Sequence, residues 1–164
     1  MKRLTIGARA CTEILALLIS VAWADERLED REKASVRAAA NVFNLPKELR
    51  DRLETALASA LPLDQILVES LSPHDRAFAY VASVWLTGVD EDVDPREQDL
   101  CDRIAERVGI SKERKTELQA IARDLLAAHK SDGEQSWADH LVTLFKAIPP
   151  RLEGSDEPIE LVIE

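Results

Sequence analysis

The chain has 164 residues and a mass of 18.3 kDa, with 21 basic and 31 acidic side chains and a formal net charge of −10. This length fits a single domain with a core large enough to need no disulfide staples. Few aromatic residues (4%) and only five glycines disfavour a β-sandwich or barrel, and the acidic balance disfavours nucleic acid as a partner, because phosphate contacts need a basic surface.

Helical periodicity covers the first half of the chain. One helix is predicted near the N-terminus, with an apolar stripe at Leu4, Cys11, Leu15, Leu18 and Ala22. A charged break at residues 25–30 ends this stripe, and a second helix is predicted over residues 30–44. Leu45-Pro46 begins a third helix, since proline is tolerated in a first turn, and residues 61–71 are expected to form a short helix or turn.

The second half alternates helix and turn in the same way. Ser72 is the predicted N-cap of a helix that runs to about Gly88. Asp94 is the predicted cap of the next helix, which Gly109 ends, and Ser111 opens another. A last apolar stripe predicts one more helix, with Trp137, Leu141, Leu144 and Phe145.

Residues 151–164 form an acidic C-terminal tail. Its apolar residues Ile159, Leu161 and Ile163 alternate with other residues, a pattern compatible with an edge strand. Disorder, or docking on another chain, is an equally good interpretation of such a terminal segment.

A shift of 65 residues superimposes the two halves of the sequence without a gap. Asp25-Glu26 falls on Asp90-Glu91, and Arg31-Glu32 falls on Arg96-Glu97. We therefore predict an internal duplication, with one unit at about residues 10–60 and the other at about 75–128. Because one such unit cannot bury its apolar face alone, the two should form a single all-α domain over residues 1–150, a compact bundle of about seven to eight helices.

The predicted loops at residues 25–32 and 90–97 are rich in carboxylates. Asp25 and Asp90 follow the end of a helix, where the dipole disfavours an anion, and close carboxylates repel one another unless a proton or a cation intervenes. A hard divalent cation, Ca²⁺ or Mg²⁺, suits such oxygen ligands. The candidate metal ligands are Asp25, Glu29, Glu32, Asp90, Asp92, Asp94 and Glu97.

Two other interpretations of these loops compete with metal binding. Asp94 with Glu97 three residues later forms an acidic version of the capping box, and runs of charge are usually solvated. An EF-hand loop is ruled out, because Pro95 occupies the glycine position and Cys101 the position of the final glutamate.

The motif Ala24-Asp25-x-x-Leu28-x-x-x-Glu32 and its second copy, Val89-Asp90-x-x-Val93-x-x-x-Glu97, resemble the TerB family of tellurite-resistance proteins. The resemblance covers about residues 14–126. It implies a compact all-α bundle of about seven helices built from two halves, with divalent metal at the acidic positions and a link to tellurite and stress resistance rather than to a reaction. Glu26 and Glu91 depart from the family, which usually has glycine there.

We therefore expect a cytoplasmic, non-enzymatic protein that binds a divalent cation and a protein partner. Cys11 and Cys101 lack CxxC spacing, which favours two buried thiols in a reducing compartment. The longest uncharged segments near the two acidic loops, residues 14–24 and 77–89, are too short to span a bilayer, so no direct membrane insertion is expected. The alternatives are a metal-free helical interaction module with an acidic docking surface and, third, an enzyme that uses a carboxylate pair.

Overall fold

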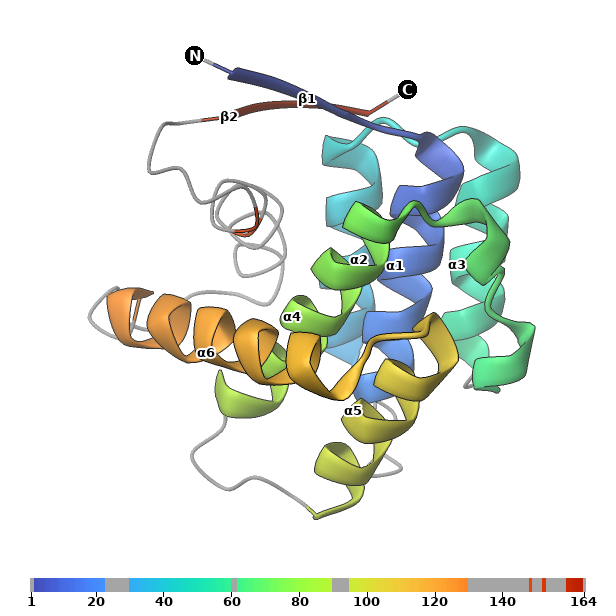
Figure 1. Ribbon diagram of the computed structural model, residues 1–164. Helices are drawn as coiled ribbons and strands as arrows, with labels where there is room; N and C mark the ends of the chain where they lie inside the picture. Colours follow the sequence, from blue (N-terminus) through green and yellow to red (C-terminus); the bar gives the residue numbers. More distant parts are fainter. Residues whose placement is uncertain are drawn as a thin grey trace.

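The computed structural model describes residues 2–22, 30–59, 62–89, 95–129, 148, 152 and 159–163. Six α-helices, two short 3-10 helices and two strands lie within these ranges (Figure 1). Their bounds are β1 Lys2–Ile6, α1 Ala8–Ala22, α2 Asp30–Val42, α3 Lys47–Ala58, η2 Leu63–Gln65, η3 Val68–Ser70, α4 Pro73–Val89, α5 Pro95–Val108, α6 Lys112–His129 and β2 Ile159–Ile163. The predicted all-α class is confirmed, and the helix predicted around Trp137 and Phe145 lies outside the described residues.

The helices α1 and α4 form the centre of the bundle. They pack against each other, α1 also packs against α3, and α4 also packs against α5 and α6. Residues 10–21 of α1 are all buried, as expected of a helix that is apolar on every side. The hydroxyl groups of Thr12 and Ser20 donate hydrogen bonds to carbonyl groups one turn earlier, at 2.8 and 3.2 Å, so these polar groups are satisfied inside the core.

The predicted helix starts at Ser72 and Ser111 are confirmed by their hydrogen bonds. The Ser72 hydroxyl accepts a hydrogen bond from the Asp75 backbone N–H at 3.1 Å, and the Asp75 carboxylate accepts one from the Ser72 N–H at 3.0 Å. This reciprocal arrangement is a capping box. The Ser111 hydroxyl accepts a hydrogen bond from the Arg114 N–H at 3.2 Å.

The turns before α3 and α6 have the same backbone geometry. Asn44 has φ of 54° and Gly109 has φ of 77°, both in the left-handed region. The N–H of Leu45 donates to the carbonyl group of residue 40 at 3.2 Å, and that of Ile110 donates to the carbonyl group of residue 105 at 2.9 Å. These are the six-to-one hydrogen bonds of a Schellman motif, so the predicted stop at Gly109 is confirmed.

Corresponding helices begin at a constant separation. The first residues of α1, α2 and α3 precede those of α4, α5 and α6 by 65 positions each. Asn44 and Gly109 are separated by the same distance along the chain. The helix starts and these left-handed turns therefore follow the shift found in the sequence.

The N-terminal residues differ from the prediction. Leu4 was expected on the first helix, but it belongs to strand β1, which pairs in parallel with β2 so that Leu4 lies opposite Leu161. The pairing lies at one end of the bundle (Figure 1). Of the interpretations of the tail, the strand is the correct one for residues 159–163, because β1 supplies a hydrogen-bonding partner that a local pattern cannot show.

Among the described residues, no helix combines the length and the apolar character that crossing a membrane requires.

Candidate functional site

The predicted metal ligands lie between helices that the structure describes. Residues 23–29 separate α1 from α2, and residues 90–94 separate α4 from α5. Five predicted ligands, Asp25, Glu29, Asp90, Asp92 and Asp94, fall in these segments and lie outside the described residues.

The other two predicted ligands belong to described helices. Glu32 is the third residue of α2 and Glu97 the third residue of α5, although their side chains lie outside what the structure describes. A carboxylate in a first helical turn interacts favourably with the helix dipole. Both residues therefore have a structural reason to be acidic, whether or not they ligate a cation.

The helices that lead into the two acidic segments carry no compensating charge at their ends. Neither α1 nor α4 has a basic residue in its last turn. The negative end of a helix dipole disfavours a carboxylate just beyond the helix unless a cation offsets it.

Elsewhere in the described ranges, no group of three or more His, Cys, Asp and Glu residues is arranged to hold a metal. Cys11 is buried, and burial, reinforced by the negative charge of Asp75, raises the pKa of its thiol to about 12. A thiol that keeps its proton is a poor ligand and a poor nucleophile, because the thiolate is the reactive form. Cys11 is therefore a packing residue.

The sequence analysis missed a buried ion pair in the first half. Glu13 of α1 is 0% exposed, and its Oε1 lies 2.9 Å from Nη2 of Arg52 on α3. The same Arg52 nitrogen donates to Glu13 Oε2 at 3.2 Å and to the carbonyl group of Gln65 at 3.0 Å. The sequence signal for this pair is Glu13 itself, an acidic residue within an otherwise apolar helix, because a buried carboxylate needs a partner.

Two arginines donate hydrogen bonds to the segment of residues 62–72, which precedes α4. Arg76 of α4 donates to the carbonyl groups of Leu71 and Val68, at 3.2 and 3.0 Å. Arg107 of α5 donates to the carbonyl groups of Asp64 and Ile66, at 3.2 and 3.1 Å. These charge-assisted bonds tie α4 and α5 to backbone carbonyl groups in and beside the two short 3-10 helices.

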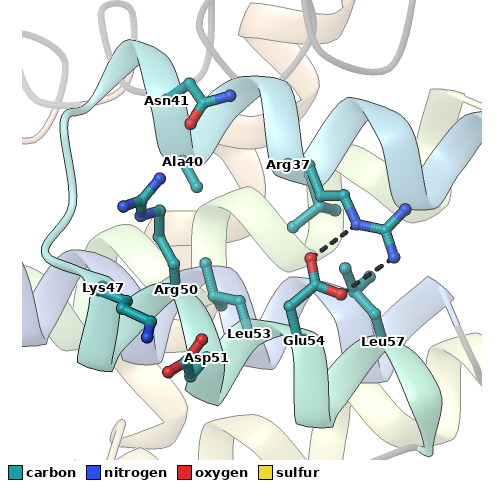
Figure 2. Close-up of a pocket in the computed structure, with 10 residues that line it drawn as sticks. Arg37, Ala40, Asn41, Lys47, Arg50, Asp51, Leu53, Glu54 and Leu57 are labelled. Carbon is teal, nitrogen blue, oxygen red and sulfur yellow. Dashed lines mark hydrogen bonds and ion pairs between the residues drawn. The ribbon is translucent and has the colours of Figure 1, made fainter.

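A groove of about 410 Å³ lies between α2 and α3 (Figure 2). Buried apolar side chains form its floor, namely Val36, Ala40, Leu53 and Leu57. Polar side chains form its rim, namely Arg37, Asn41, Lys47, Arg50, Asp51 and Glu54. None of these rim residues was among the predicted site residues.

One end of the groove is closed by an ion pair. Arg37 Nε lies 2.6 Å from Glu54 Oε1, and Arg37 Nη2 lies 3.0 Å from Glu54 Oε2, so the pair is bidentate (Figure 2). The hydrogen bond from Arg37 lowers the pKa of the Glu54 carboxyl group. At the other end, Arg50 extends from α3 toward α2 (Figure 2).

The chain matches no protein-family model, and no curated protein and no solved structure is significantly similar to it.

Proposed function

We propose that the chain is a duplicated helical binding protein of the TerB kind, without catalytic activity, that holds divalent cations at its two acidic inter-helix segments. One observation carries the proposal: three helix starts and one left-handed turn recur at a single separation of 65 residues. Agreement of several independent boundaries in one register supports a repeated unit. The acidic segments then occupy the same place in both units.

The position of the acids within the unit supports cation binding. Asp25 and Asp90 follow corresponding helices that lack a basic residue in the last turn, and Glu32 and Glu97 begin corresponding helices. Oxygen ligands of this kind prefer hard cations, so the cation class is Ca²⁺ or Mg²⁺.

The second segment is the stronger candidate. It carries Asp90, Asp92 and Asp94 without an intervening base, whereas Arg27 and Arg31 interrupt the first segment. Basic neighbours neutralise carboxylates and so reduce the need for a cation. We expect the tighter site at residues 90–97.

The wider role is stress-related, as the TerB resemblance implies, and we propose that it includes a protein partner. Cys11 and Cys101 are both buried, as expected of two thiols under the reducing conditions of the cytoplasm.

Thermal unfolding with and without cations tests the proposal. At about 100 times its Kd, a cation that binds only the native state adds about 2.7 kcal/mol to the free energy of unfolding. The full chain is unfolded in EDTA, Ca²⁺ or Mg²⁺, with tryptophan fluorescence as the measurement. We expect a higher Tm with at least one cation.

Asp90→Asn should abolish this shift, and it should leave the Tm in EDTA unchanged or slightly raised because it relieves repulsion. Asp124→Asn is the matched control, since Asp124 is exposed on α6 and the same charge is removed. A lower Tm of Asp90→Asn in EDTA would make Asp90 a structural residue. No shift with either cation would favour a metal-free module whose acidic surface docks a basic partner.

A further inference from the structure

The buried ion pair between α1 and α3 contains two polar atoms that are not hydrogen-bonded. Arg52 Nη2 lies 2.9 Å from Glu13 Oε1 and donates a hydrogen bond to Glu13 Oε2 at 3.2 Å. The contact with Oε1 is an ion pair whose alignment makes no hydrogen bond, so Glu13 Oε1 lacks a hydrogen-bond partner within the described part of the chain. Arg52 Nε lacks one there as well, and both atoms are buried. One buried acceptor and one buried donor therefore belong to the same ion pair.

The exposed pair of Arg37 and Glu54 shows the arrangement that uses both groups fully. Nε and Nη2 of Arg37 each donate to a different oxygen of Glu54, at 2.6 and 3.0 Å. Arg52 instead places Nη2 beside both oxygens of Glu13, and the same nitrogen donates to the carbonyl group of Gln65 at 3.0 Å. Because Nε and Nη2 belong to one guanidinium group, Arg52 Nε stays near the carboxylate without bonding to it.

The two atoms define the chemistry of a ligand that would complete the pair. A buried polar atom without a hydrogen bond is unfavourable, so such atoms usually have a protein or water partner. The guanidinium of Arg52 repels a cation, and the carboxylate of Glu13 repels an anion. The ligand must therefore be neutral, accept a hydrogen bond from Nε and donate one to Oε1. Water is the smallest molecule that does both, and the 26% exposure of Arg52 gives it a path from the surface.

We propose that a buried water molecule bridges Arg52 Nε and Glu13 Oε1 and forms part of the α1–α3 interface. It accepts a hydrogen bond from Nε and donates one to Oε1, and two such partners lie within the usual range for buried water. The proposal uses no residue of the acidic segments, so it does not depend on cation binding.

The corresponding positions of the second unit do not repeat this pair. The residue 65 positions after Glu13 is the buried, apolar Phe78. The residue 65 positions after Arg52 is Glu117, whose side chain is 64% exposed and pairs with Arg114 of the same helix. The water site therefore belongs to the first unit and distinguishes it from the second.

A crystal structure of the full chain, at a resolution that shows ordered water, tests the site directly. We expect one density peak at about 2.7–3.2 Å from both Arg52 Nε and Glu13 Oε1. Crystals soaked in bromide and in rubidium salts distinguish water from an ion, because both ions scatter anomalously. An anomalous peak at the site, a site without a density peak, or a direct hydrogen bond from Nε to Oε1 would each overturn the proposal.

Nuclear magnetic resonance of the ¹⁵N-labelled chain tests the same site in solution. The Arg52 Nε–H signal, identified by its loss in Arg52→Lys, should show a nuclear Overhauser effect to water with the sign of a long-lived bound molecule. Glu13→Leu removes the acceptor of the water, so we expect this effect to vanish and the Nε–H to exchange with solvent about tenfold faster. Glu54→Leu is the matched control, since it removes the same side chain from the exposed pair, and it should leave the Arg52 signal unchanged.

Two results in solution would contradict the proposal. The first is a wild-type Arg52 signal without an Overhauser effect to water, and the second is an effect that persists unchanged in Glu13→Leu. The Tm of Glu13→Leu shows whether this variant folds. If it does not, the crystal structure and the Overhauser effect of the wild-type chain decide the question by themselves.

Discussion

Replacing Arg52 with methionine should destabilise the protein strongly, because it leaves the buried carboxylate of Glu13 without its ion-pair partner. Glu13 is 0% exposed, and Arg52, itself 26% exposed, is its ion-pair partner. Removing one member of a buried pair costs about 3–5 kcal/mol, since the other charge stays desolvated. The partial exposure of Arg52 lets water reach the site, so we expect the lower end, about 3 kcal/mol.

For a chain of this size, about 3 kcal/mol corresponds to a fall in Tm of roughly 6–12 °C. Urea unfolding at pH 7, followed by circular dichroism, measures the free energy directly. Arg123→Met is the control, because Arg123 is exposed on α6, and its effect should stay within about 0.5 kcal/mol.

The double variant Glu13→Leu/Arg52→Met distinguishes charge burial from loss of packing. Apolar replacement of a whole buried pair is often neutral or stabilising, and the residue 65 positions after Glu13 is Phe78, an apolar side chain that is fully buried. We expect the double variant to recover most of the stability lost in Arg52→Met. A loss below about 1 kcal/mol in Arg52→Met, or a double variant no better than it, would refute the reasoning.

Three further predictions concern the turns, the joining segment and a buried thiol. Gly109→Ala and Asn44→Ala should each lower the free energy of unfolding by about 1–2 kcal/mol in urea titrations, because alanine is strained at positive φ; unchanged stability in both would contradict the turn geometry. Arg76→Met should cost about 2–3 kcal/mol by the same assay through its lost carbonyl hydrogen bonds, and a cost near zero would show that these bonds carry no net stability. In a Cys101→Ala background, Cys11 should react with a thiol reagent at pH 8 only after unfolding, because its pKa is raised to about 12. Because the pKa of Cys11 is higher in the folded state, its contribution to the free energy of unfolding is fully present below about pH 9 and is lost as the pH rises toward 12. Fast labelling of the folded protein, or a free energy of unfolding that does not fall between about pH 9 and 12, would contradict this prediction.

The sequence by itself determined the all-α class, the helix starts at Ser72 and Ser111 and the helix stop at Gly109. Ser72 and Ser111 are caps because their hydroxyl groups reach nearby backbone N–H groups, and Gly109 ends a helix because it tolerates a left-handed backbone. Each of these effects acts over fewer than six residues, so each is readable from a local pattern.

The predicted acidic segments were also found by pattern, through their recurrence at 65 residues. Most of their residues lie outside the described ranges, so cation binding at Asp25 and Asp90 stays a prediction.

Only the tertiary structure decided which distant residues meet. Leu4 was placed on a helix because the pairing of β1 with a strand at the other end of the chain has no local trace. The pairing of Glu13 with Arg52 depends in the same way on how helices pack side by side. Helix starts and turns are set by residues that are close in the sequence. Ion pairs and grooves are set by residues that are far apart in the sequence and meet only in the folded structure. Periodicity in one sequence carries no information about which of these distant residues meet.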